Sequence, residues 1–92
     1  MVTIEEAKEV IKQLPKRFDS HDFLRQYILA YTWPYLQLLK ETKEVTNLHM
    51  RVGLFLKQNA EEELSIRKVD EVVTENIFGT PSPCGLWEKT KK

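Results

Sequence analysis

The chain has 92 residues, of which 41% are hydrophobic and 30% charged, and its 14 basic residues balance its 14 acidic ones. This length predicts one domain with a single hydrophobic core, and the apolar content argues against intrinsic disorder away from the ends. The balanced charge argues against a nucleic-acid partner, because nucleic-acid binders usually carry a basic excess or a basic stripe.

Few residues suggest chemistry. Cys84 is the only cysteine, which excludes an internal disulfide and a cysteine-based metal cage. His21 and His49 lie far apart in the sequence. His21 with Asp19 and Asp22 has the composition of a metal site or an acid–base pair, but helix capping explains both carboxylates without chemistry. We therefore expect no catalytic residue, no metal and no cofactor.

No segment approaches the roughly 20 apolar residues that cross a bilayer. Residues 1–12 alternate charged and apolar side chains, unlike the apolar core of a signal peptide. We expect a cytoplasmic protein with no membrane partner.

The first predicted helix begins after Thr3. Thr3 and Glu6 have the spacing of a capping box, in which each side chain accepts a hydrogen bond from the backbone of the other residue. Ile4, Ala7 and Ile11 then recur at helical spacing until Pro15 ends the helix.

Helix is also predicted from about residue 20 to residue 41, where Asp19 or Ser20 would cap it. Pro34 lacks an amide proton and crowds the preceding turn, so it requires a kink or a fresh start. The segment is thus one long kinked helix or two short ones. Trp33 would fill the space that a kink opens.

A third helix is predicted to begin at a cap formed by Thr46 or Asn47 and to end near residue 63 or 64. Its apolar face is formed by Leu48, Val52, Phe55, Leu56 and Ala60. Gly53 inside this helix costs about 1 kcal/mol relative to alanine. We interpret it as the point where another helix backbone approaches closely.

The chain closes with a predicted β-hairpin. Val69, Val72 and Val73 favour a strand from residue 66, residues 79–85 contain turn-forming glycine and proline, and residues 86–89 form the return strand. The fold class is therefore α+β and mostly helical, with three helices, one of them kinked, and a C-terminal hairpin. Residues 1–2 and 90–92 are expected to fray.

This order of elements resembles the winged helix-turn-helix family over nearly the whole chain. The chain is also similar to small bacterial proteins of unassigned function, in its Phe-Asp-Ser-His-Asp-Phe segment and in Asn-Ile-Phe-Gly ahead of a terminal tryptophan. The winged-helix resemblance implies a non-catalytic domain whose third helix enters the major groove of double-stranded DNA, while the hairpin contacts the DNA backbone or minor groove.

Under this hypothesis two sets of residues contact DNA. Side chains of the third helix would read the bases: Asn47, His49, Arg51, Lys57 and Gln58. Residues in and near the hairpin would contact phosphates: Arg67, Lys68, Thr80, Ser82 and Lys89.

The alternative hypothesis is a protein-interaction module or a homodimer. Met50 and Leu54 lie four residues apart, outside the main apolar stripe of the third helix, where a DNA-reading helix is normally polar. Trp33 and Trp87 would be further anchors. One coherent positive face would favour DNA binding, whereas mixed charges and an exposed apolar patch would favour a protein partner.

Overall fold

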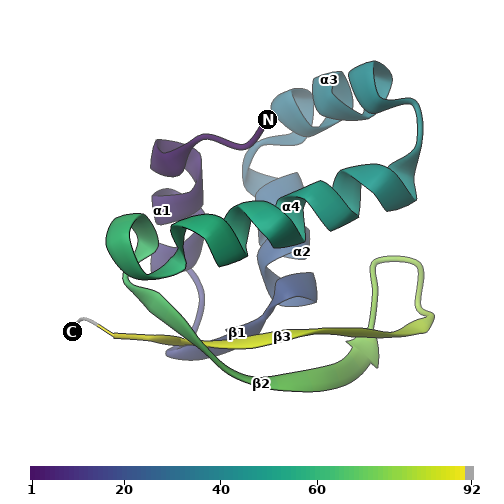
Figure 1. Cartoon of the computed structure of the whole chain (residues 1–92). Coiled ribbons are helices and arrows are strands. Elements are labelled where there is room, and N and C mark those ends of the chain that lie inside the picture. Colours follow the sequence, from purple (N-terminus) through teal and green to yellow (C-terminus); the bar gives the residue numbers. More distant parts are fainter. Residues whose placement is uncertain (91–92) are drawn as a thin grey trace.

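The computed structural model describes residues 1–90, which form four α-helices, a short π-helix and a three-stranded antiparallel sheet (Figure 1). The helices pack on one side of the sheet. The predicted α+β, mostly helical class is confirmed. Within the described residues, no helix has the length and apolar character that crossing a membrane requires.

Two reciprocal capping boxes start the first two helices. In α1 (Ile4–Lys12), Thr3 Oγ1 accepts from the Glu6 amide at 3.1 Å and Glu6 Oε1 accepts from the Thr3 amide at 3.0 Å. In α2 (Ser20–Ala30), Asp19 and Asp22 exchange the same pair of bonds at 2.8 and 3.0 Å. Both boxes satisfy amides that have no partner inside the helix, so these predicted helix starts are confirmed.

Pro34 marks a restart, because the chain turns at Tyr31 and α3 (Thr32–Thr42) begins with the proline in its first turn. An amide there has no intrahelical partner to lose. The three-helix count is corrected to four α-helices within residues 1–90. The prediction that Trp33 fills a kink was wrong: there is no continuous kinked helix to fill, and the indole is 80% exposed.

The helix α4 (Val45–Asn59) continues as a π-helix, η1 (Ala60–Leu64), which ends at Ser65 in the left-handed conformation. The predicted cap at Thr46 or Asn47 was wrong, because the helix begins earlier and Glu44 is its N-cap without a side-chain bond. The expected close approach at Gly53 was also wrong, since a Cβ there would have no neighbour within 4 Å.

The predicted hairpin is confirmed, with β2 (Ile66–Glu75) antiparallel to β3 (Pro81–Lys89). Its turn is residues 76–80 and lies earlier than predicted, because Asn76 Oδ1 accepts from the amides of Phe78 and Thr80 and Gly79 adopts a φ of 79°. β3 also pairs with a short strand, β1 (Arg17–Asp19), but only through residues 86–88. Pro81 and Pro83 lie outside this pairing, so their missing amide protons cost no hydrogen bond to β1.

A short strand that the sequence did not reveal, β1 (Arg17–Asp19), completes the sheet in the order β1-β3-β2. It places Phe18 opposite Trp87 and Asp19 opposite Leu86. On the other side of β3 the register slips between Lys68 and Asp70, which makes Val69 the extra residue of a β-bulge.

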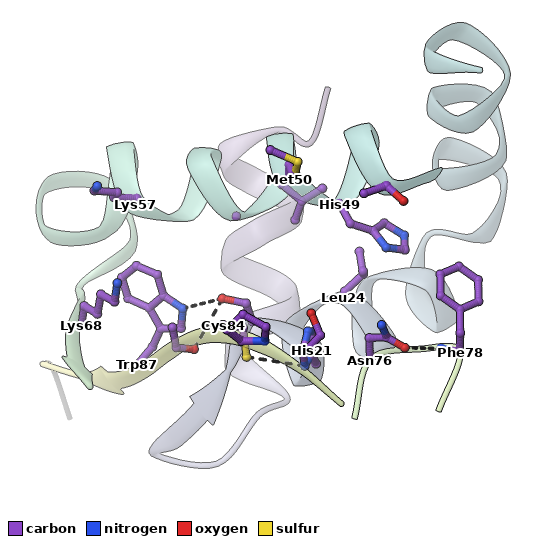
Figure 2. Close-up of a pocket in the computed structure, with 17 residues that line it drawn as sticks. His21, Leu24, His49, Met50, Lys57, Lys68, Asn76, Phe78, Cys84 and Trp87 are labelled. Atoms are coloured by element: carbon purple, nitrogen blue, oxygen red, sulfur yellow. Dashed lines mark hydrogen bonds between the residues drawn. The ribbon is translucent and has the colours of Figure 1, made fainter. Parts of the chain in front are cut away.

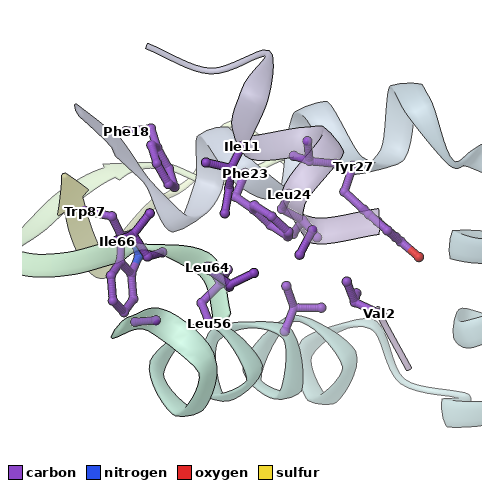
Figure 3. Packing of buried hydrophobic residues seen from close by; sticks show 14 of the residues in the cluster. Val2, Ile11, Phe18, Phe23, Leu24, Tyr27, Leu56, Leu64, Ile66 and Trp87 are labelled. Atoms are coloured by element: carbon purple, nitrogen blue, oxygen red, sulfur yellow. The ribbon is translucent and has the colours of Figure 1, made fainter. Parts of the chain in front are cut away.

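The core lies between the sheet and the helices (Figure 3). Phe18, Trp87 and Ile66, one from each strand, are 1%, 3% and 0% exposed, and Leu56 of α4 belongs to the same cluster. The Trp87 indole donates to Ser20 Oγ at 3.0 Å, which ties β3 to the start of α2. Trp87, predicted as an interface anchor, is thus largely covered by the core.

Residues near both ends of the described chain contact the rest of the fold. Val2 is 3% exposed and belongs to the core, and the Thr90 amide donates to Ser65 O at 2.9 Å. The fraying predicted at residues 91–92 lies outside the described residues.

On the opposite face of β3 from Trp87, Glu88 lies between two arginines of the flanking strands. Arg17 Nε donates to Glu88 Oε2 at 2.8 Å, and Arg67 Nη2 donates to Oε1 at 2.8 Å. The hydrogen bonds from Arg67 and then from Arg17 lower the pKa of Glu88 to about 2. This carboxylate joins all three strands.

Two glycines provide a matched test of packing. A Cβ on Gly85 would lie 3.3 Å from atoms of the Trp87 indole, which burial and the Ser20 bond hold in place. We expect Gly85→Ala to lower the free energy of unfolding by about 1–3 kcal/mol, measured by urea denaturation. Gly53→Ala should raise it by about 0.4–1 kcal/mol, because that site is open and helical. Equal effects of the two substitutions would contradict this packing.

Glu88 makes the free energy of unfolding depend on pH at acidic pH. Because the folded pKa is below the ordinary 4.5, the carboxylate stabilises the fold above that pH and this contribution is lost as pH falls toward 2. Glu88→Gln should flatten the pH dependence of the unfolding free energy in this window. Arg67→Gln should shift the loss to higher pH. An unchanged pH profile in Glu88→Gln would contradict the role of this group.

Candidate functional site

An open cleft of about 380 Å³ lies between α4 and the hairpin, next to the start of α2 (Figure 2). Leu24 of α2, Val52 of α4 and Trp87 of β3 contribute apolar surface to it. Met50 and Phe78 also line it and are 63% and 60% exposed. Exposed apolar side chains that adjoin a cleft form a contiguous surface, and contiguous apolar surfaces mark binding sites.

Two lysines line one end of the cleft. Lys57 extends from α4 and Lys68 from β2, both near Trp87 in Figure 2. Lys68 pairs with Glu71 at 2.5 Å, and Lys57 has no ion pair within the described residues. This end of the cleft therefore offers positive charge beside an apolar surface.

The other end is aromatic. The His49 ring stacks on Phe78 with centroids 6.0 Å apart, and His49 Nε2 shares a 2.9 Å hydrogen bond with the Tyr35 hydroxyl. Burial lowers the pKa of His49 below its ordinary value, and repulsion from His21 lowers it further. The imidazole is thus neutral near pH 7, which keeps this end of the cleft uncharged.

The hairpin turn that carries Phe78 is held from two sides. The Arg25 side chain of α2 donates to the carbonyl of Asn76 at 3.1 Å and also to that of Glu75. The Asn76 side chain in turn accepts from the Phe78 amide at 2.9 Å. Phe78 is therefore positioned by backbone bonds before any ligand binds.

A second group of polar side chains borders the cleft. Ligand atoms of Asp19, His21 and Cys84 lie within 4.8 Å of one another, and His21 and Cys84 also line the cleft. His21 Nδ1 lies 2.7 Å from Thr74 Oγ1 and 3.5 Å from Cys84 Sγ. The sheet thus unites residues that are more than 60 positions apart in the sequence.

The residues predicted to read DNA separate into two groups. Asn47, Arg51, Lys57 and Gln58 are exposed on α4, as the DNA hypothesis requires. His49 is not on that exposed face, because its ring turns inward between Tyr35 and Phe78.

The residues predicted to contact phosphates do not converge on one positive face. Arg67 is paired with Glu88 on the far side of the sheet, and Lys89 Nζ donates to Leu14 O at 2.6 Å. Lys68 and Ser82 line the cleft, whereas Thr80 is exposed in the hairpin turn. The charges around the hairpin are mixed, with Asp70, Glu71 and Glu75 exposed along β2.

The residues predicted to form a protein interface do not lie on one surface. Met50 and Leu54 are exposed next to each other on α4, and Met50 lines the cleft. Trp33 is exposed on α3 but does not line the cleft, whereas Trp87 lines the cleft and is only 3% exposed.

Sequence reasoning missed the proximity of Asp19, His21, Cys84 and Thr74. Local signals explain Asp19 as a cap, and Cys84 as part of a proline-rich turn. The missing signal was the strand at Phe18, since only its pairing with β3 brings the two ends of the chain together.

Comparisons of the chain with protein-family models, with curated proteins and with solved structures give no match.

Proposed function

We propose that this domain is a protein-binding module whose cleft between α4 and the hairpin holds a short segment of a partner protein. The observation that carries the proposal is an open, largely apolar cleft whose rim side chains, Met50 and Phe78, are more than half exposed. Leu54 extends the apolar surface along α4 and is 53% exposed. Burying these groups against a partner would be favourable, at about 25 cal/mol for each Å² of apolar surface removed from water.

The charges around the cleft define the chemistry of the partner. Lys57, which has no ion pair within the described residues, favours a carboxylate at one end, whereas neutral His49 with Phe78 favours an apolar side chain at the other. The partner segment therefore combines large apolar residues with at least one Asp or Glu. Charges on the rim contribute mainly to orientation and association rate.

Gly53 supports the same function. It lines the cleft at a helical position where glycine is unfavourable, and no packing partner explains it. A side chain at this position would project into space that a ligand needs. Because Gly53 has no side chain, the space above α4 at this position stays open to a ligand.

DNA binding by a winged helix is the second candidate. The order of elements and the sheet order β1-β3-β2 support a winged-helix architecture, and Asn47, Arg51 and Gln58 are exposed on α4. The ion pairs of Arg67 and Lys68 with acidic neighbours weaken the positive potential around the hairpin. This is why we rank DNA second.

Peptides selected from a random-sequence display library should bind the cleft with micromolar dissociation constants and should be rich in large apolar and acidic residues. Gly53→Leu should weaken their binding at least roughly tenfold, because a side chain would occupy the cleft. Lys57→Glu should weaken it by roughly fivefold through loss of the carboxylate contact. Fluorescence anisotropy measures both effects.

The matched controls lie outside the cleft. Gln58→Leu adds the same side chain to the same helix, and Lys40→Glu reverses an exposed charge on α3; both should bind peptide as the wild type does. Selected peptides that bind Gly53→Leu with unchanged affinity would refute the cleft as the binding site.

Duplex DNA separates the two candidates. The cleft proposal predicts no binding to a random library of short duplexes beyond weak, sequence-independent association. Winged-helix DNA binding predicts an affinity that falls steeply with salt and is lost in Arg51→Ala, since phosphate contacts release counterions. An anisotropy titration at two salt concentrations measures this, and salt-sensitive binding lost in Arg51→Ala would favour DNA.

A further inference from the structure

Asp19, His21 and Cys84 come from three different elements and bring three kinds of metal ligand together. Asp19 ends β1 and caps α2, His21 lies in the first turn of α2, and Cys84 belongs to β3. Asp19 and His21 are 8% and 9% exposed, and Cys84 is half-buried. Buried polar groups that converge from separate elements are costly unless they interact with one another or with a ligand.

Strand register explains why these groups meet. Asp19 lies opposite Leu86, and Thr74 lies opposite Ser82. Positions 82, 84 and 86 of β3 share one face, because side chains alternate along a strand. Cys84 therefore lies on the same side as Asp19 and Thr74, and His21, two residues after Asp19, contacts both Thr74 and Cys84.

The distances suit a tetrahedral ion. With metal–sulfur and metal–nitrogen bonds of about 2.3 and 2.0 Å, two ligands of a tetrahedral zinc ion lie about 3.5 Å apart. His21 Nδ1 and Cys84 Sγ are 3.5 Å apart. These two atoms are already at ligand spacing, and a bound metal would replace the contact of His21 Nδ1 with Thr74 Oγ1.

The hydrogen bonding of the Asp19 carboxylate allows it to act as a metal ligand. Within the described residues only its Oδ1 accepts a hydrogen bond, from the Asp22 amide at 2.8 Å, so Oδ2 is left for a cation. A hydrogen bond to one oxygen of a carboxylate is the kind of support that orients metal ligands. The Thr74 hydroxyl, 2.7 Å from His21 Nδ1, borders the same space.

We propose that Asp19, His21 and Cys84 bind one divalent cation of the zinc class, with the fourth position left to water. The carboxylate and a thiolate together balance the two positive charges of the ion. A sulfur, a nitrogen and an oxygen ligand select zinc or cobalt over magnesium or calcium, which prefer oxygen alone. The proposal is independent of the protein-binding function.

Cobalt titration tests the site on the full chain, purified without a histidine tag and freed of metal. We expect one equivalent of Co²⁺ to bind with a thiolate-to-cobalt charge-transfer absorption and to be displaced by Zn²⁺. Cys84→Ser and His21→Gln should each weaken Zn²⁺ binding at least roughly tenfold in calorimetry. His49→Gln changes the other histidine of the cleft and should bind Zn²⁺ as the wild type does.

A second measurement needs no substitution, in case a variant fails to fold. Zn²⁺ should slow the alkylation of Cys84 by iodoacetamide in the wild-type chain, because the metal-bound thiolate is protected, whereas Mg²⁺ should have no effect. Cobalt binding without a sulfur charge-transfer band, or alkylation unaffected by Zn²⁺, would overturn the proposal. Lys57→Glu weakens peptide binding and should retain the metal, so the two proposals fail separately.

Discussion

The pairing of β1 with β3 is the constraint on which the rest of this structure depends. Three residues, Arg17–Asp19, pair with residues near the end of the described chain and make β3 the central strand. This pairing seats Phe18 against Trp87 in the core and holds Glu88 within reach of both Arg17 and Arg67. It also fixes where α2 begins, because Asp19 is both the last residue of the strand and the cap of the helix.

Local rules predicted most of the helices and the hairpin. The capping boxes, the apolar spacing of α1 and the strand preference of β2 depend on neighbours within a few residues, so sequence alone reveals them. Pro34 was ambiguous for the same reason: a proline ends regular hydrogen bonding locally, but only packing decides between a kink and a restart.

The incorrect predictions concern residues whose surroundings depend on contacts between distant parts of the sequence. Trp33 and Trp87 are the same residue type, yet one is exposed and the other fills the core, because only Trp87 faces the helices from the central strand. Gly53 was assigned to helix packing, but its surroundings are open and it lines the cleft. The group formed by Asp19, His21 and Cys84 was missed because Cys84 joins the other two residues only through the sheet.

The β-bulge at Val69 has a consequence for the chemistry of the hairpin. Lys68 and Thr74 are six positions apart and would share a face in a regular strand. The extra residue reverses this relation, so Lys68 lies opposite Trp87 while Thr74 lies opposite Ser82 and within 3.7 Å of Cys84. Strand length at this point therefore determines which side chains face the metal ligands, because a strand one residue shorter would put Lys68 and Thr74 on the same face.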